Sequence, residues 1–330
     1  MSETYFPVRC SQLNQNALIN ELLYRYEVKE PITCNLFRRG MNDVYIIETE
    51  GKRYFLRISF TDVYEYQDYV DEAYIINLLN DNDIFVATPV HCKDENCIWS
   101  INAPEGIRYA MLFNEAKNNP SGDNLKKIHN VGTNVARIHT ITDNNNVVLN
   151  RASIDIFQLT ENPLRLIKPH LNNRMNDHEY LVEASNRLAK YISEKLTTDK
   201  PYYGFCHGDI QQSNFYFIGE NPIFFDFDCM GYGWRAHDIC IYLWNNTLSN
   251  EKFIESEEWK TFLEGYNAVR ILDKNELLAI NAFAALRGLW VMGVHADLVE
   301  RNLGCQIFSK GYFDFFIGNI KMWDNRIFNK

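Results

Sequence analysis

Residues 205–228 read FCHGDIQQSNFYFIGENPIFFDFD, and this stretch decides the fold. Gly219 to Pro222 form a turn between two arms rich in aromatic and β-branched residues, which predicts a β-hairpin. Counting back from the turn centre places Asn214 opposite Asp226. Because Asp209 lies on the loop that enters this hairpin, we expect three oxygen-bearing side chains to gather at one end of it.

Such a cluster suits Mg²⁺, which is bound by carboxylate and amide oxygens together with substrate phosphates. Kinases use this pattern, a His-x-Asp-x-x-x-x-Asn segment followed by a later Asp, and the first Asp orients or deprotonates the attacking hydroxyl. The pattern predicts Asp209 as the catalytic residue, with Asn214 and Asp226 as metal ligands. Asp228, on the same strand face as Asp226, is a second metal candidate or a cap for the following loop. His207 is expected to position the loop rather than to move protons.

His-Gly-Asp alone also occurs in ordinary turns, but the spaced Asn and the later Asp favour a kinase site. Through His207-Gly-Asp209-x-x-x-x-Asn214 and Asp226-Phe-Asp228, the sequence resembles the aminoglycoside phosphotransferase and choline kinase superfamily. Weaker similarities to that superfamily occur at residues 131–139 and at residues 237–239.

The resemblance implies an α+β, bilobal protein-kinase-like fold that binds ATP and Mg²⁺ between its lobes. It further implies a small N-terminal lobe, an antiparallel sheet with one helix, and a larger, mostly helical C-terminal lobe. A polar run at residues 114–124 marks the boundary. We therefore expect residues 1–116 to bind the ATP phosphates and adenine. Residues 117–330 are expected to carry the catalytic loop, the magnesium site and the acceptor-binding helices.

Hydrophobic periodicity and turn residues predict the elements of both lobes. In the first lobe a hairpin is expected around Glu50-Gly51-Lys52, with further strands at 88–90 and 109–113 and helices at 11–26 and 71–79. In the second lobe, helices are expected at 125–139, 177–196, 257–267 and 275–300, with another near the C-terminus.

A kinase also needs a cation near the ATP phosphates, usually a strand Lys paired with a helix Glu. The matching strand position holds Arg57, on the face of Phe55 and opposite to Leu56. A cation in so apolar a strand needs an anionic partner, and Glu72 on the next predicted helix is the candidate. The alternative is a structural ion pair without a nucleotide.

Further nucleotide contacts are expected at the loop of residues 38–43, where Gly40 permits close backbone approach and Asn42 follows. The arginine pair in this loop, Arg38 and Arg39, could equally be solvated surface charge. The resemblance places the adenine at the lobe connection, beside Phe113, Asn114 and Glu115.

The acceptor is expected to be a small hydroxylated molecule, because only eleven residues separate Asp226 from Asp238 and no Ala-Pro-Glu motif follows. In the superfamily the late helices build the acceptor pocket. The candidates there are Trp290, His295, Asp297 and Glu300, with core packing or a solvated face as the alternative. The acidic candidates favour a cationic acceptor, such as an amino-containing antibiotic or metabolite.

Other readings within the superfamily are homoserine-type and choline-type kinases, stress-response Ser/Thr kinases and a non-catalytic nucleotide-binding protein. The net charge of −10, from 33 basic and 43 acidic residues, argues against a nucleic-acid partner. Without a signal-peptide pattern or a continuous apolar stretch of about 18 residues, we expect a cytoplasmic protein with no membrane partner. Eight cysteines without zinc-site spacing are expected to be reduced thiols. The sequence does not indicate an oligomeric state.

Overall fold

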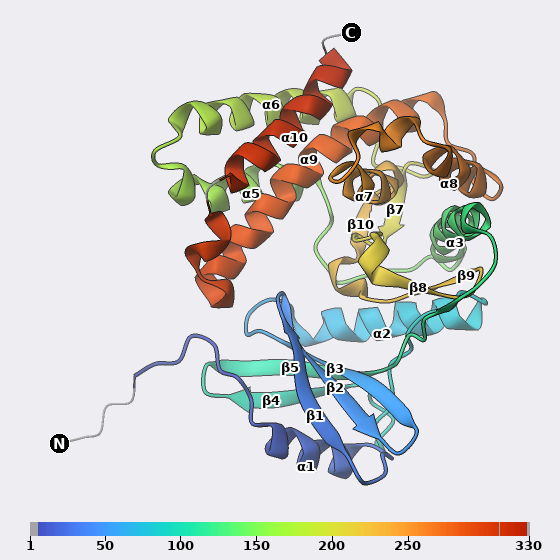
Figure 1. The fold of residues 1–330 in the computed structure, drawn as a ribbon, viewed down its shortest axis with the longest axis vertical. Helices are drawn as coiled ribbons and strands as arrows, with labels where there is room; N and C mark the ends of the chain where they lie inside the picture. The colour runs from blue at the N-terminus through green and yellow to red at the C-terminus, as the bar shows by residue number, and fades with distance from the viewer. Residues whose placement is uncertain (1–5, 310, 329–330) are drawn as a thin grey trace.

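The computed structural model describes residues 6–309 and 311–328. The chain folds into two lobes, with a sheet-containing lobe below a mostly helical one in Figure 1. This arrangement is the α+β, bilobal protein-kinase-like fold that the sequence predicted.

The N-terminal lobe is built on a five-stranded antiparallel sheet of order β1-β2-β3-β5-β4. Its strands are β1 (Thr33–Arg39), β2 (Asn42–Thr49), β3 (Lys52–Ser59), β4 (Ile98–Ala103) and β5 (Gly106–Asn114). Two helices accompany the sheet, α1 (Gln15–Arg25) and α2 (Tyr66–Asp81). Figure 1 shows α1 on the side of the sheet away from the second lobe and α2 between the sheet and that lobe.

Strand alternation decides what each face of β3 contacts. Leu56 and Ile58 pack with Leu18 of α1 in one buried cluster. Arg57 points to the opposite face, toward α2. The apolar face therefore fixes α1 on the sheet, and the other face is left for a charged group at the interface between the lobes.

Two sequence expectations for this lobe need correction. The first helix begins at Gln15 rather than Ser11, because Asn14 caps it by accepting hydrogen bonds from the amides of Asn16 and Ala17. The strand expected at residues 88–90 is only an isolated bridge beside β5, since Pro89 cannot donate a backbone hydrogen bond.

The C-terminal lobe contains longer helices and short strands. Its helices are α3 (Asn124–Asn144), α4 (Ile156–Leu159), α5 (Glu161–Ile167), α6 (Met175–Ser193), α7 (Arg235–Thr247), α8 (Glu257–Asn267), α9 (Lys274–Leu298) and α10 (Tyr312–Phe328). Its strands are β6 (Asn119–Pro120), β7 (Tyr203–Cys206), β8 (Phe215–Gly219), β9 (Asn221–Phe224) and β10 (Gly231–Trp234).

Helix α3 packs closely against α8 because each contributes a glycine at their contact. A Cβ atom on Gly132 would lie 2.0 Å from the Phe262 carbonyl oxygen, and one on Gly265 would lie 2.0 Å from the His129 carbonyl oxygen. Any larger residue at either position would push the helices apart. This contact holds α3 beside the strands that carry the site.

Helix α9 is the centre of the C-terminal lobe and contacts α5, α6, α7 and α10. The sequence expectation that no stretch is long and apolar enough to cross a membrane needs correction, because the run Lys274–Leu303 is so by length and composition. However, 67% of its most apolar window is buried inside the protein. A helix that is apolar on most sides is expected in the core of a large lobe. We therefore interpret α9 as the core helix, onto which the surrounding helices pack.

Candidate active site

The loop after β7 carries His207, Gly208 and Asp209, and hydrogen bonds to Asp238 of α7 hold it in place. The two carboxylate oxygens of Asp238 accept hydrogen bonds from the backbone N–H groups of His207 and Gly208, both at 2.8 Å. Gly208 has a φ of +80°, and a Cβ there would lie 2.0 Å from the Cys229 carbonyl oxygen. Only glycine fits at this position, because a residue with a Cβ atom would clash with the Cys229 carbonyl oxygen and would disfavour this backbone conformation.

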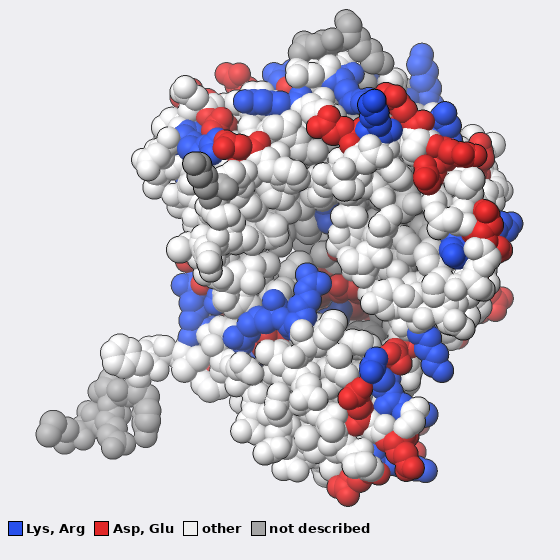
Figure 2. Space-filling model, viewed as in Figure 1, with Lys and Arg blue, Asp and Glu red and all other residues white. Residues whose placement is uncertain are grey.

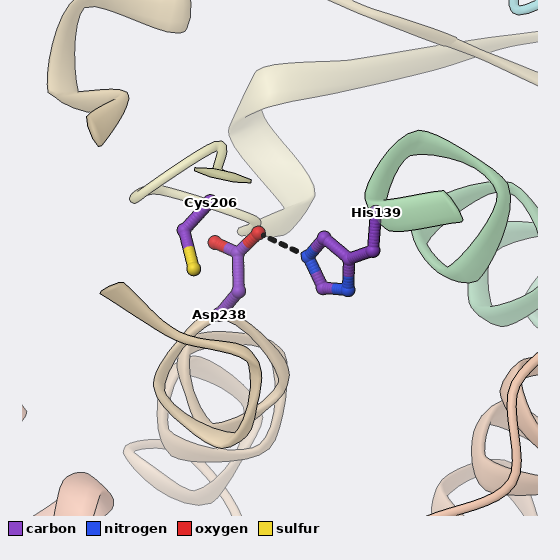
Figure 3. A group of neighbouring side chains, drawn as sticks. All are labelled: His139, Cys206 and Asp238. Atoms are coloured by element: carbon purple, nitrogen blue, oxygen red, sulfur yellow. Dashed lines mark hydrogen bonds and ion pairs between the residues drawn. The ribbon is translucent and has the colours of Figure 1, made fainter. Parts of the chain in front are cut away.

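Figure 3 shows the buried group His139, Cys206 and Asp238, which come from α3, β7 and α7. His139 Nε2 lies 3.0 Å from Asp238 Oδ2, and its Nδ1 lies 2.9 Å from the Tyr266 hydroxyl. Burial lowers the pKa of His139 to about 4, so the ring is neutral and donates one hydrogen bond to Asp238.

The residue types of this group are those of a metal site, but its oxygen and sulfur atoms already take part in hydrogen bonds within the protein. Both Asp238 oxygens accept backbone hydrogen bonds, and the Cys206 thiol donates to the Trp234 carbonyl oxygen at 3.4 Å. Burial raises the pKa of Cys206 well above its usual 9.0, so the sulfur keeps its proton. We conclude that the group anchors the loop that carries Asp209.

His207 connects this loop with the strand that precedes Asp226. Its Nδ1 accepts the Asp209 backbone N–H at 3.3 Å, and its Nε2 lies 3.2 Å from the Phe225 carbonyl oxygen. Burial lowers the pKa of His207. A neutral ring with both nitrogens in use matches a positioning group rather than a proton carrier.

The Asp209 carboxylate is oriented by three side chains. Its Oδ2 accepts hydrogen bonds from Asn214 Nδ2 at 2.6 Å and Gln211 Nε2 at 2.8 Å, and its Oδ1 accepts one from Arg287 Nη2. Arg287 also donates to the Gly208 carbonyl oxygen at 3.2 Å. The sequence analysis did not predict this role for Arg287. The one indication in the sequence was a charged residue within the otherwise apolar run of α9.

The hairpin register differs by one residue from the expected one. Phe215 pairs with Phe224, so Asn214 lies opposite Phe225 rather than Asp226. The physical reason is a tight two-residue turn at Gly219 and Glu220, which places the turn centre half a residue earlier than predicted. Asn214 nonetheless remains near the start of the acidic segment.

Asp226 and Asp228 follow β9 on a sharply turned backbone. Asp226 adopts a left-handed conformation, with φ 64° and ψ 59°, and its side chain is 44% exposed. Asp228 is 3% exposed; its Oδ2 accepts a hydrogen bond from Asn42, and its Oδ1 has no hydrogen-bond donor among the described residues. Asn42, expected in the loop of residues 38–43 that approaches the nucleotide, also contacts the acidic pair.

These residues fit a divalent cation. Asp228 Oδ1, which accepts no hydrogen bond among the described residues and lies 4.0 Å from Arg57, offers a hard oxygen ligand of the kind that Mg²⁺ takes, as do the Asp226 carboxylate and the Asn214 amide. The Asp226 side chain is partly exposed, but the protein atoms packed around its carboxylate and the neighbouring Asp228 carboxylate raise its pKa to about 7. A bound cation would offset that repulsion.

The predicted pairing of Arg57 and Glu72 is present. Two guanidinium nitrogens of Arg57 lie 2.8 and 2.6 Å from the two carboxylate oxygens of Glu72. Arg57 Nη1 is also 3.9 Å from Asp226, so the pair borders the acidic segment. Arg151, which sequence reasoning missed, lies 3.2 Å from Glu72 and 4.1 Å from the Tyr64 ring centroid.

The loop between β1 and β2 reaches the cleft between the lobes. Figure 2 shows the molecule hollowed there, with basic side chains gathered near the tip of this hairpin. The backbone N–H of Gly40 donates a hydrogen bond to the Asn42 carbonyl oxygen at 3.0 Å. The Gly40 carbonyl oxygen accepts one from the Asn302 side chain at 3.1 Å. Arg39 pairs with Asp43 at 2.8 Å, whereas Arg38 is exposed.

The residues expected at the adenine lie at the end of β5. The Phe113 ring lies under the Arg57 guanidinium, 5.1 Å from its centroid. Asn114 bonds to Thr88 through its backbone N–H at 2.9 Å, and Glu115 pairs with Arg53 at 3.2 Å. Phe113, Asn114 and Glu115 therefore lie where the chain leaves β5 and connects to the second lobe.

Two adjoining cavities open beside the catalytic loop. The larger, of about 850 Å³, is lined by residues of the β3–α2 loop, by residues 150–154 and by Gly208, Arg287 and Trp290. The smaller, of about 270 Å³, shares Trp290 and Asp62 with it and reaches Asp297.

Of the four expected acceptor residues, the structure brings only two to these cavities. Trp290 lines both, and Asp297 lines the smaller one while pairing with Arg301 at 2.7 Å. His295 instead contacts the Tyr312 hydroxyl at 2.7 Å, and Glu300 pairs with Arg9 at 3.5 Å. His295 and Glu300 are missing from both linings because the end of α9 turns them toward α10 and the N-terminal segment.

Comparisons with known proteins agree with this geometry. Residues 34–277 match the model of the phosphotransferase enzyme family. The chain is 30% identical to an uncharacterised protein of Synechocystis sp. over 301 residues, which covers 89% of this chain and 81% of that protein. Its fold is similar to an amicoumacin kinase solved with AMP-PNP and Ca²⁺, with a TM-score of 0.76, 20% identity and coverage of 95% and 94%. It is also similar to a microcompartment-associated aminopropanol kinase, with a TM-score of 0.73, 16% identity and coverage of 94% and 97%. The chain therefore belongs to the phosphotransferase enzyme family.

Proposed function

We propose that the protein is an ATP- and Mg²⁺-dependent kinase that transfers the γ-phosphoryl group to a hydroxyl of a small, amine-bearing molecule. The observation that carries this proposal is that Asn214 donates to the Asp209 carboxylate through its side chain and accepts the backbone N–H of Phe225, just before Asp226, beside a cavity of about 850 Å³. A hydroxyl-orienting carboxylate and a set of metal-binding oxygens are the two parts that phosphoryl transfer requires.

In this mechanism Asp209 accepts the proton of the acceptor hydroxyl. The hydroxyl oxygen forms a bond to the γ-phosphorus while the bond from that phosphorus to the β–γ bridging oxygen breaks, and its electron pair leaves with ADP. Asp226, Asp228 and Asn214 would hold Mg²⁺, which neutralises charge on the phosphates when bound. His207 and Asp238 keep the loop fixed while the proton moves.

The nucleotide is assigned to the cleft between the β1–β2 loop and the acidic segment. Arg57, held by Glu72 and close to Asp226, is placed to contact the phosphates. Gly40 allows the β1–β2 loop to approach them, and the adenine would lie beside residues 113–115. A guanidinium gives forked contacts with phosphate oxygens where most kinases use a lysine.

The acceptor is assigned to the larger cavity. Asp62 lines both cavities and, among the described residues, forms no ion pair, so it is available for an ammonium group. The names of the relatives support an amine-bearing acceptor, because one phosphorylates an amicoumacin and another an aminopropanol.

The test is a panel of acceptors with Mg²⁺·ATP, in which ADP release and the phosphorylated product are both measured. The panel contains amino alcohols, amino-containing antibiotics, hydroxy amino acids and neutral sugars, with Asp209→Asn as the inactive control. We expect product from at least one amine-bearing alcohol and none from the control. Transfer only to a neutral or anionic acceptor would contradict the assignment to amines, and nucleotide binding without transfer to any acceptor would contradict the assignment as a kinase.

A further inference from the structure

Arg287 connects the core helix α9 with the catalytic carboxylate. Its side chain is 4% exposed, donates to Asp209 Oδ1 and to the Gly208 carbonyl oxygen, and lies over Trp290, 4.1 Å from the ring centroid. Arg287 and Trp290 are three residues apart on one helix, so they share a face. Both line the larger cavity.

The hydrogen bonds of Asp209 distinguish its two oxygens. Each carboxylate oxygen can accept about two hydrogen bonds. Oδ2 already accepts two, from Gln211 and Asn214, whereas Oδ1 accepts only one, from Arg287, among the described residues. The remaining acceptor position is therefore on Oδ1, next to the Arg287 guanidinium.

We propose that Arg287 is a positioning residue that makes Asp209 Oδ1 the proton-accepting oxygen and places the reactive hydroxyl of the acceptor against the Arg287–Trp290 wall of the cavity. This inference rests on the proposed kinase function. The group acts through Asp209 and takes no part in the bond changes themselves. Its planar fork suits the role, because one guanidinium holds both the carboxylate and the adjacent carbonyl oxygen.

The catalytic loop has other supports that do not depend on Arg287. Asp238 holds the backbone of His207 and Gly208, and Asn214 holds Asp209 through Oδ2. Loss of the guanidinium should therefore leave the loop folded and free one carboxylate oxygen to rotate. A small misplacement of a reacting group is enough to lower a rate by about 100-fold.

The first experiment compares Arg287→Met and Arg287→Lys with wild type, using the acceptor found by the panel. We expect kcat to fall about 100-fold in Arg287→Met, with the KM for Mg²⁺·ATP changed less than threefold, and partial recovery of kcat in Arg287→Lys. The control is Arg187→Met, which removes an arginine that pairs with Asp324 at 2.6 Å between α6 and α10. Wild-type kcat in Arg287→Met would overturn the proposal, as would an equal loss in the Arg187 control.

The second experiment does not depend on turnover or on the stability of an Arg287 variant. The fluorescence of Trp290 is obtained as the difference between wild type and Trp290→Phe, a substitution that keeps an aromatic face for Arg287. We expect the acceptor, added with Mg²⁺·AMP-PNP, to change this difference signal, and AMP-PNP alone to leave it unchanged. An unchanged signal at saturating acceptor would show that the hydroxyl lies elsewhere.

The outcomes separate this inference from the proposed function. If wild type phosphorylates an acceptor and Arg287→Met does so equally well, the inference fails and the kinase function stands. If wild type binds nucleotide and phosphorylates no acceptor, the function fails and the inference fails with it.

Discussion

Asn42 Nδ2 lies 2.9 Å from Asp228 Oδ2, although the two residues are 186 positions apart in the chain. The contact joins the tip of the β1–β2 hairpin to the acidic segment after β9. Tyr64 adds a second link by donating its hydroxyl to the Asp228 carbonyl oxygen at 2.9 Å. The geometry of the proposed metal site is thus coupled to the position of the N-terminal lobe.

Replacing Asn42 with Ala should weaken the binding of Mg²⁺·ATP. The substitution leaves a second oxygen of a buried carboxylate without its donor and releases the hairpin tip. We expect the Kd for Mg²⁺·AMP-PNP to rise about tenfold by calorimetry, with no comparable change in Arg38→Ala, whose side chain is exposed. Equal affinities in wild type and Asn42→Ala would show that the contact does not support the site.

Asp209→Asn should abolish turnover without abolishing nucleotide binding. The amide keeps the shape of the side chain but cannot accept the hydroxyl proton, and such a group contributes about 10²- to 10⁴-fold to a rate. Single-turnover transfer and AMP-PNP binding are measured on the same preparation. Transfer at the wild-type rate would remove Asp209 from the proton-accepting role.

Asp226→Ala and Asn214→Ala should each raise the Mg²⁺ concentration needed for half-maximal transfer. Both substitutions remove an oxygen from the proposed ligand set. Asp226→Ala also removes a negative charge, so its effect should be the larger. A Mg²⁺ titration at saturating ATP decides this. A normal Mg²⁺ requirement in Asn214→Ala would restrict the role of Asn214 to its hydrogen bond with Asp209.

Glu72→Gln should destabilise the protein strongly. Glu72 is fully buried and faces both Arg57 and Arg151, so its neutralisation leaves two buried guanidinium groups without their carboxylate. Breaking a buried ion pair in this way costs about 3–5 kcal/mol. Urea unfolding measures the loss, with Glu48→Gln as the control, because the exposed Glu48–Arg53 pair is screened by water and contributes little to stability. Similar losses in the two variants would contradict this account of the buried cluster.

Stability should fall as the pH is lowered below about 6.5, because His139, His207 and His237 are buried and resist protonation. Burial lowers the pKa of His139 to about 4 and that of His237 to about 3, from the usual 6.5. The unfolded chain therefore binds these protons first, and the free energy of unfolding drops as the pH falls toward those values. For His139, a pKa shift of this size lowers the free energy of unfolding by about 3 kcal/mol between pH 7 and pH 4.

His237→Phe provides a direct check of this pH dependence. Both ring nitrogens of His237 lack hydrogen-bond partners among the described residues, and the ring packs edge-on against Phe283, so Phe should fit. We expect near-normal stability at pH 7.5 and a shallower decline between pH 6.5 and 4.5 in urea unfolding. A decline as steep as that of wild type would exclude His237 as a contributor.

Local patterns in the sequence were enough to predict that Asp209 lies close to Asn214 and that Arg57 pairs with Glu72. A loop, a hairpin and strand alternation are determined over a few residues, so spacing alone brings Asp209 close to Asn214. The one-residue error in the hairpin register arose at Glu220, because the turn length depends on backbone geometry that composition does not specify.

Tertiary packing decided everything that joins distant segments. Arg287 meets Asp209 only because α9 packs against α7, which holds the loop of Asp209, and Asn42 meets Asp228 only because the lobes contact each other. The same packing turned Glu300 away from the cavity and brought Asp62 to it. The sequence by itself therefore determined which polar residues gather around Asp209, because their spacing along one loop and hairpin is local. The residues that orient Asp209 and line the cavity depended on how helices far apart in the chain bury their apolar faces.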